Sequence, residues 1–232
     1  MICLVTCGIA GIGHLGKALT QQFEEADVQI HTYHPTLERR AKFVKEFKKA
    51  KAVNFSELLS QPIVLLTLPA EKIPIFLKNA QEEISSNSIP PIFVNLSSLV
   101  HTKELRNEFP YFQIYGIKMV GHADYLYEHG NGVFLTETPL NTENFQDIRY
   151  LFEKIGRLFE DNEDVVKKIN GLAIRNIIEA CVKFEDEAKG YSRVYREKAM
   201  ESIFPNTMRL YKEGSFDGFM LKVMEEMNLK YK

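Results

Sequence analysis

Short apolar runs alternate with amphipathic stretches through the first 160 residues of the chain. The apolar runs have the length and residue types of buried strands, and they lie at residues 2–9, 28–33, 63–68, 92–96, 112–119 and 132–136. Between them, apolar positions spaced three and four residues apart predict helices at residues 15–25, 37–49, 73–84, 102–109 and 144–155. Strands that alternate with helices form βαβ units, so we expect an α/β fold with a mostly parallel sheet covered on both faces.

The pattern changes after residue 160. One long helical pattern covers residues 160–190, further helices follow with breaks near Pro205 and Gly214, and no strand-like run remains. We therefore predict an α/β domain over residues 1–160 and an all-helical domain over residues 161–232. Roughly 70 residues of helix bury little core alone, so these helices should pack on the first domain or on a second subunit.

Composition narrows the classes of partner. Lys and Arg number 29 against 31 Asp and Glu, so charge gives no reason to expect a nucleic acid or an anionic membrane as partner. No run approaches the roughly 18 apolar residues of a membrane helix, and the apolar start lacks the basic region of a signal peptide. Cys3, Cys7 and Cys181 form no CxxC pair, which favours reduced thiols in a cytoplasmic protein. The histidines show no HxH or HExxH spacing, so no metal site is expected.

A glycine motif carries the clearest functional signal. Gly11, Gly13 and Gly16 form GxGxxG between an apolar strand and a helix. The first glycine permits the tight turn, the second lets the backbone approach a pyrophosphate, and the third lets the helix lie close on the strand. This predicts a Rossmann-type dinucleotide-binding domain, the alternative being a glycine-rich turn without a ligand. The predicted contacts from this loop are Gly11, Ile12, Gly13, His14, Leu15 and Gly16.

The end of the second strand indicates which dinucleotide binds. NAD-binding domains usually place Asp or Glu there for the ribose hydroxyls, but this chain has His34, and the first carboxylate that follows is Glu38. Thr36, Arg39 and Arg40 can instead hydrogen-bond and neutralise a 2′-phosphate. NADP is therefore expected as the cofactor. The alternative is that both arginines only solvate a helix face.

These residues also resemble a known family. "CGIAGIGHLGKAL" is similar to the "IGFIGxGxMGxAL" opening of the 6-phosphogluconate dehydrogenase-like NADP-binding proteins, nearest to pyrroline-5-carboxylate reductases and deazaflavin-dependent NADP oxidoreductases. "YHPTLERR" is similar to their "xNRTxEK" segment, and "IVLLTLPAEKI" to "DVVFLAVKPQ", which passes the nicotinamide side of the cofactor. "IFVNLSSLV" is placed like the fifth strand, whose end approaches the nicotinamide. The resemblance thus implies that Leu68, Pro69 and Ser97 contact the cofactor.

Further along the chain the resemblance concerns the fold more than the motifs. "IYGIKMVGHADY" lies where the reductases carry "RVMPNTPA", and their Ser-Gly-Ser-Gly-Pro substrate loop is absent from "NGLAIRNIIEACVKF". In the family, C-terminal helices interlock between two subunits, and the substrate site lies between them and the nucleotide domain. The resemblance therefore implies a homodimer, without implying proline biosynthesis.

The candidate catalytic residues are those that could act on a substrate beside the cofactor. NADPH supplies the hydride, so the protein must position and polarise a carbonyl or imine. Lys118 and His122 follow a strand at its carboxyl end, where such groups are expected, and Asn170 lies near the start of the long helix. The alternative for the first two is an exposed lysine and a loop histidine without a role.

We therefore expect an NADP-dependent oxidoreductase that transfers a hydride between NADPH and a small carbonyl, imine or deazaflavin acceptor, resembling pyrroline-5-carboxylate reductase. The alternative is an NADP-binding redox sensor or scaffold without turnover. A cleft beside Ser97, Lys118 and Asn170 that could hold a substrate would favour the enzyme.

Overall fold

The computed structural model describes residues 6–84 and 89–229 of the 232-residue chain. The start of the first predicted strand, including Cys3, lies outside the described residues. The chain divides into two compact units, Met1–Gly171 and Leu172–Lys232, which are described separately below. The boundary expected after residue 160 stays a prediction, because one long helix runs across this region.

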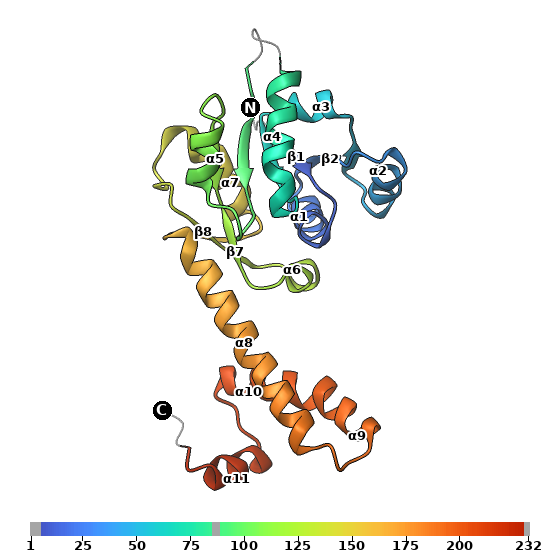
Figure 1. Cartoon of the computed structure of the whole chain (residues 1–232), viewed down its shortest axis with the longest axis vertical. Helices are drawn as coiled ribbons and strands as arrows, with labels where there is room; N and C mark the ends of the chain where they lie inside the picture. Colours follow the sequence, from blue (N-terminus) through green and yellow to red (C-terminus); the bar gives the residue numbers. More distant parts are fainter. Residues whose placement is uncertain (1–5, 85–88, 230–232) are drawn as a thin grey trace. The chain divides into compact units, whose positions relative to one another are not determined.

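A six-stranded parallel sheet forms the centre of the first unit (Figure 1). The strands are β1 (Thr6–Ala10), β2 (Gln29–Tyr33), β3 (Ala50–Ala52), β4 (Ile63–Leu66), β5 (Ile92–Asn95) and β6 (Ile114–Gly116), in the order β3-β2-β1-β4-β5-β6. The direction of winding reverses between β1 and β4, and ligands of such sheets bind beyond the carboxyl ends of the strands at this switch point. The predicted α/β fold with a Rossmann-type parallel sheet is confirmed.

Helices and a second small sheet surround the central sheet. The helices are α1 (His14–Glu25), α2 (Leu37–Phe43), α3 (Phe55–Leu59), α4 (Ile73–Glu83), α5 (Thr102–Glu108), α6 (Ala123–His129) and α7 (Gln146–Glu153). The second sheet contains β7 (Lys118–Val120), β8 (Gly132–Thr136) and β9 (Gly156–Glu160), with β8 antiparallel to β7 and parallel to β9. The run predicted as one strand at 112–119 is therefore split between two sheets, β6 and β7.

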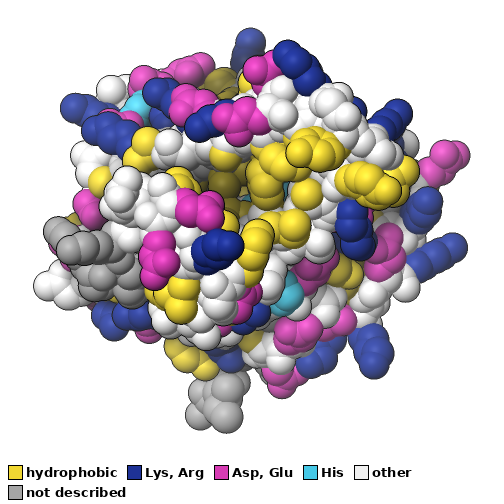
Figure 2. Space-filling view, turned by 90° about the horizontal axis from the view of Figure 1, so that it is seen from below, with side chains coloured by type: hydrophobic (Ala, Val, Ile, Leu, Met, Phe, Trp, Pro, Cys, Tyr) yellow, Lys and Arg dark blue, Asp and Glu magenta, His cyan; other side chains and the backbone are white. Residues whose placement is uncertain are grey.

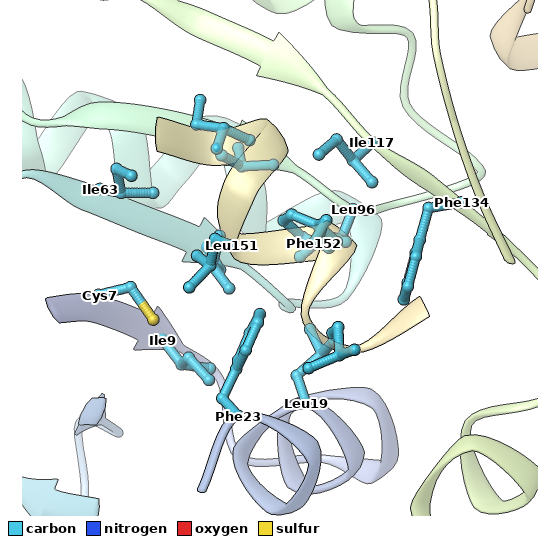
Figure 3. Packing of buried hydrophobic residues seen from close by; sticks show 14 of the residues in the cluster. Cys7, Ile9, Leu19, Phe23, Ile63, Leu96, Ile117, Phe134, Leu151 and Phe152 are labelled. Carbon is cyan, nitrogen blue, oxygen red and sulfur yellow. The ribbon is translucent and has the colours of Figure 1, made fainter. Parts of the chain in front are cut away.

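Two apolar clusters pack on opposite faces of the central sheet, because neighbouring strand residues point to opposite faces. Cys7 and Ile9 of β1 join the cluster with α1 and α7, whereas Ala10 joins the cluster with α3, α4 and α5. Figure 3 shows the first cluster, in which Phe23 of α1 lies beside Ile9 of β1 and packs edge-on against Phe152 of α7. Burial raises the pKa of the Cys7 thiol to about 12, so this cysteine is a core residue and no nucleophile at neutral pH.

The second unit is helical throughout its described part. It contains most of α8 (Glu163–Glu187), then α9 (Arg193–Lys198), a π-helical turn at Ala199–Ile203, α10 (Phe204–Glu213) and α11 (Gly218–Glu226). The predicted helical C-terminal region is thus confirmed. The break expected near Pro205 is wrong, because the proline lies in the first turn of α10 and the π-helical turn before it continues the helix. The break near Gly214 is present, and this glycine ends α10 with φ 65°.

Two absences concern the described residues. Within 6–84 and 89–229, no helix combines the length and apolar character needed to cross a membrane. Over the same ranges, no three side chains of His, Cys, Asp or Glu gather in a way that could hold a metal ion.

Candidate functional site

The three glycines of the motif occupy three different environments. Gly11 has φ +108°, and a Cβ atom there would lie 2.6 Å from the Thr67 carbonyl oxygen. A Cβ atom at Gly16 would lie 2.1 Å from the Gly11 carbonyl oxygen, so α1 can approach the loop only without a side chain at this position. A Cβ atom at Gly13 would meet no atom within 4 Å. Gly11 and Gly16 are therefore required by packing, whereas Gly13 leaves a space open.

The glycine loop is fixed by hydrogen bonds from Thr67, the residue that follows β4. Thr67 donates through its hydroxyl to the carbonyl oxygens of Ala10 (3.0 Å) and Gly11 (2.8 Å), and its N–H also donates to Ala10. Helix α1 then begins at His14, and Gly13 supplies no side-chain cap. The first N–H groups of a helix have no acceptor within it, and they carry partial positive charge. This arrangement suits an anionic group placed over Gly13.

A hollow of about 650 Å³ lies over the glycine loop, and we call it the glycine-loop hollow. Most of the predicted cofactor contacts line it, namely Gly11, Ile12, Gly13, Leu15, His34, Arg39, Leu68, Pro69 and Ser97. The remaining three lie beside it. Gly16 is buried under the loop, Thr36 precedes α2 and donates its N–H to the His34 ring (3.0 Å), and the His14 ring points to Asp124 (2.7 Å). The structure therefore brings together residues that are distant in the sequence.

One end of the hollow carries positive charge. Arg39 and Lys42 of α2 line it together with Glu46, whose carboxylate is paired with Lys17 of α1 at 2.6 Å. Arg40 differs, because it donates to the Val53 carbonyl oxygen (2.9 Å) and supports the fold. Sequence reasoning missed Lys42, although its spacing of three residues from Arg39 places both on one helix face.

A second hollow, of about 640 Å³, adjoins the first and shares His34, Leu68 and Pro69 with it. Aromatic rings form part of its lining, with the centroids of Tyr33 and Phe55 5.4 Å apart. The two hollows together follow the carboxyl ends of β1, β2 and β4. Because the two hollows adjoin, one extended ligand could occupy both of them across the switch point.

Lys118 lies under the far end of the glycine-loop hollow and is not exposed. Its Nζ atom donates to the carbonyl oxygens of Asn95 (3.3 Å), Ser97 (2.6 Å) and Val100 (3.2 Å). It also lies 3.5 Å from the Glu163 carboxylate, and the two side chains are 2% and 5% exposed. Burial lowers the pKa of Lys118 to about 8, while Glu163 opposes part of this shift. The alternative of an exposed lysine is therefore wrong.

His122 and Asn170 both lie around the loop that follows β7. His122 precedes α6 and accepts the Asp124 N–H through its ring at 3.4 Å, while its side chain stays 75% exposed. Asn170 accepts the Gly121 N–H (3.0 Å) and donates to the Met119 carbonyl oxygen (3.1 Å). The Asn170 side chain therefore holds the loop from which His122 projects.

One contact beside this loop was missed by sequence reasoning. The His14 ring, at the start of α1, hydrogen-bonds to Asp124 of α6, and this bond holds the pKa of Asp124 below its ordinary value. His122 lies on the other carboxylate oxygen of Asp124 at 3.5 Å. No local pattern reveals such a contact, because its partners are far apart in the sequence.

A known protein family matches the N-terminal part of the chain, which contains most of this site. Residues 6–89 match the family described as NADP oxidoreductase, coenzyme F420-dependent. The matched stretch runs from β1 through α4 and includes every residue of the glycine-loop hollow except Leu96 and Ser97. No curated protein sequence matches the chain.

Solved structures resemble most of the chain, including the stretch matched by the family. Plasmodium falciparum pyrroline carboxylate reductase with NADP bound has a TM-score of 0.61 and 15% identity, over 97% of this chain and 91% of that one. An imine reductase from Myxococcus stipitatus in complex with NADP+ has a TM-score of 0.62 and 14% identity, over 96% and 78%. An imine reductase from Aspergillus terreus in complex with NADPH4 and dibenz[c,e]azepine has a TM-score of 0.61 and 11% identity, over 89% and 73%. At these identities the likeness shows the fold alone.

Proposed function

We propose that the chain is an NADP-dependent oxidoreductase that transfers a hydride between NADPH and a small carbonyl, imine or deazaflavin acceptor. The observation that carries this proposal is the glycine-loop hollow, with Arg39 and Lys42 at one end and Ser97 at the other. The family of residues 6–89 binds NADP, and the similar solved structures hold NADP or its reduced forms. The hollow supplies the residue types that this cofactor requires.

The residues fit the parts of the cofactor in order. Gly13 and the start of α1 would hold the pyrophosphate, since the open space at Gly13 admits a close approach to the backbone. Arg39 and Lys42 would hold the 2′-phosphate by charge-assisted hydrogen bonds. The adjoining hollow, with Tyr33, would take the adenine, and the end at Ser97 would face the nicotinamide. When bound, the cofactor supplies the hydride, and the chain supplies position and polarity.

For the proton that accompanies hydride transfer, we propose His122 as donor. Its ring is exposed beyond β7 and can exchange a proton with water or with an acceptor. Asn170 would act as a positioning residue, because it fixes the loop before His122 through Gly121 and Met119. The Nζ atom of Lys118 is already held by three carbonyl oxygens, so it is the less suitable donor.

Replacing Arg39 with alanine is expected to weaken NADPH binding and to leave NADH binding nearly unchanged. The lost charge-assisted contact is worth about 1.5–3 kcal/mol, or roughly a 10- to 150-fold increase in Kd. Isothermal titration calorimetry at fixed salt would measure both cofactors. The matched control is Lys45→Ala, which removes one exposed positive charge nearby without touching the hollow. Equal loss for both cofactors would contradict the assignment of Arg39 to the 2′-phosphate.

Turnover needs a separate test, because binding alone would also suit a redox sensor or scaffold. We would follow NADPH absorbance with cyclic imines, keto esters and an oxidised deazaflavin as acceptors, and repeat the active pair with His122→Gln. Turnover that falls in this variant, with NADPH binding intact, would support the proposed enzyme and proton donor. Tight NADPH binding without turnover for any acceptor class would favour the non-catalytic role.

We further propose that the protein is a homodimer. Ile174, Ile178 and Val182 form a stripe along α8, and their side chains are 56–60% exposed. Hydrophobic side chains also gather on the face shown in Figure 2. Exposed apolar stripes of this kind are typical of interfaces, and a second copy of the chain would bury them.

Sedimentation should therefore give the mass of a dimer for the wild-type chain at micromolar concentration. Ile178→Glu should shift it to the monomer, because a carboxylate would be buried without a partner in the interface. Lys183→Glu adds a negative charge at an exposed position of the same helix and serves as the control. A wild-type monomer, or dissociation in both variants alike, would contradict this placement of the interface.

A further inference from the structure

A buried ion pair lies beneath the turn that closes the nicotinamide end of the glycine-loop hollow. Lys118 is 1% exposed and Glu163 is 6% exposed, so the two charges depend on each other and on nearby polar groups. Lys118 belongs to β7 and Glu163 begins α8, both within the first unit. Neither residue lines the hollow, and the proposed reaction uses neither.

Buried polar side chains hydrogen-bond to the backbone of the turn between β5 and α5. Asn95 is fully buried and donates to the Val100 carbonyl oxygen (2.8 Å), while its own amide oxygen accepts the Ser97 N–H (3.1 Å). The Thr102 N–H donates to Glu163 at 3.1 Å. The three carbonyl contacts of Lys118 complete this network, and the strongest by distance is to Ser97, at 2.6 Å. Ser97 lines the hollow, and its carbonyl oxygen thus accepts a hydrogen bond from the buried ammonium of Lys118.

We propose that Lys118 is a positioning residue that fixes residues 96–100 at the end of the glycine-loop hollow. This inference rests on the proposed function only where it concerns cofactor affinity. An ammonium has three N–H donors and serves three converging carbonyl oxygens at once, which no apolar side chain of similar length can do. Glu163 compensates the charge, so the lysine can remain protonated in a buried place.

The hold of Lys118 on residues 96–100 should depend on pH, because a neutral amine keeps only two N–H donors for three carbonyl oxygens. Burial brings the pKa of Lys118 to about 8, and the facing carboxylates of Glu163 and Glu137 oppose this shift. The other charged groups beside the network are the exposed pair of His101 and Asp164, 3.3 Å apart. Affinity for the anionic cofactor should therefore decline as pH rises through about 8.

The test compares the wild-type chain with Lys118→Met/Glu163→Gln, which removes both charges and leaves no buried carboxylate unpaired. Lys103→Met is the control, since it removes an exposed lysine from the neighbouring helix α5. Hydrogen exchange in the cofactor-free protein should be about tenfold faster at residues 96–100 in the double variant, the effect of losing hydrogen bonds to a charged group. NADPH and NADH should both bind more weakly by a similar factor, unlike in Arg39→Ala, and the decline above pH 8 should disappear.

The outcomes separate this inference from the proposed function. Unchanged exchange at residues 96–100 in the folded double variant would overturn the positioning role, whatever the cofactor affinities. Faster exchange at these residues in the double variant would support the role of Lys118. If the wild-type chain at the same time bound neither cofactor, the proposed function would be refuted. A loss restricted to NADPH, or a decline above pH 8 that persists in the double variant, would also count against Lys118.

Discussion

Replacing Gly16 with alanine should reduce the free energy of unfolding by about 3 kcal/mol, at the upper end of the usual cost of overpacking. The new Cβ atom would lie 2.1 Å from the Gly11 carbonyl oxygen and 3.0 Å from the Thr67 hydroxyl oxygen. The first of these is a backbone atom of a loop already fixed to β4, so it cannot move aside cheaply. Urea unfolding followed by circular dichroism would measure the loss.

Gly13→Ala is the matched control within the same motif. Gly13 has φ −75°, which any residue adopts, and its Cβ atom would point into open space. Its stability should therefore stay within about 1 kcal/mol of the wild type, while NADPH binding should weaken roughly 100-fold, because the methyl group occupies the path of the pyrophosphate. If Gly13→Ala bound NADPH normally, the proposed position of the pyrophosphate would be wrong.

The second large effect is expected in the core, at Phe152 of α7. This ring is fully buried and lies between Phe23 of α1 and Phe134 of β8, at centroid distances of 5.9 Å and 5.0 Å (Figure 3). Phe152→Ala should cost about 3–5 kcal/mol, since the cavity cannot collapse when three elements meet around it. Chemical denaturation with the same spectroscopic probe would measure this.

Tyr150→Ala provides the comparison for Phe152→Ala. It removes an aromatic ring from the same helix, but this residue is 51% exposed and its ring lies under the Lys154 ammonium, 5.0 Å from the ring centroid. Its cost should stay below about 1 kcal/mol. Equal losses in the two variants would mean that α7 contributes to stability through the helix itself and not through the Phe152 ring.

The parts of the fold that sequence predicted are those encoded by local pattern. The strands β1, β2, β4 and β5 are short apolar runs, and the glycine motif specifies a loop within a few residues. The short elements β3 and α6 were not predicted, because β3 has three half-exposed or exposed residues and α6 packs on α1 through tertiary contacts. The split of residues 112–119 between two sheets also depends on partner strands that the run itself does not encode.

The candidate site shows the same division. The motif and the missing carboxylate after β2 pointed to Gly13 and Arg39, and both line the glycine-loop hollow. The burial of Lys118 could not, because its partners Ser97 and Glu163 come from other elements and have no spacing that reveals the contact. Sequence thus predicts positions that line the glycine-loop hollow, while the hydrogen-bond network that supports them becomes visible only in the folded chain.

The glycine-loop hollow draws its whole lining from the stretch between Gly11 and Ser97, whereas His122 and Asn170 come later in the chain. Under the proposed function, the residues that hold the cofactor and those that act on the acceptor therefore come from consecutive parts of the chain. On that proposal, substitutions at His122 or Asn170 would alter the acceptor side alone, whereas Lys118 and Glu163, in the same later part, still reach the cofactor end of the hollow through Ser97.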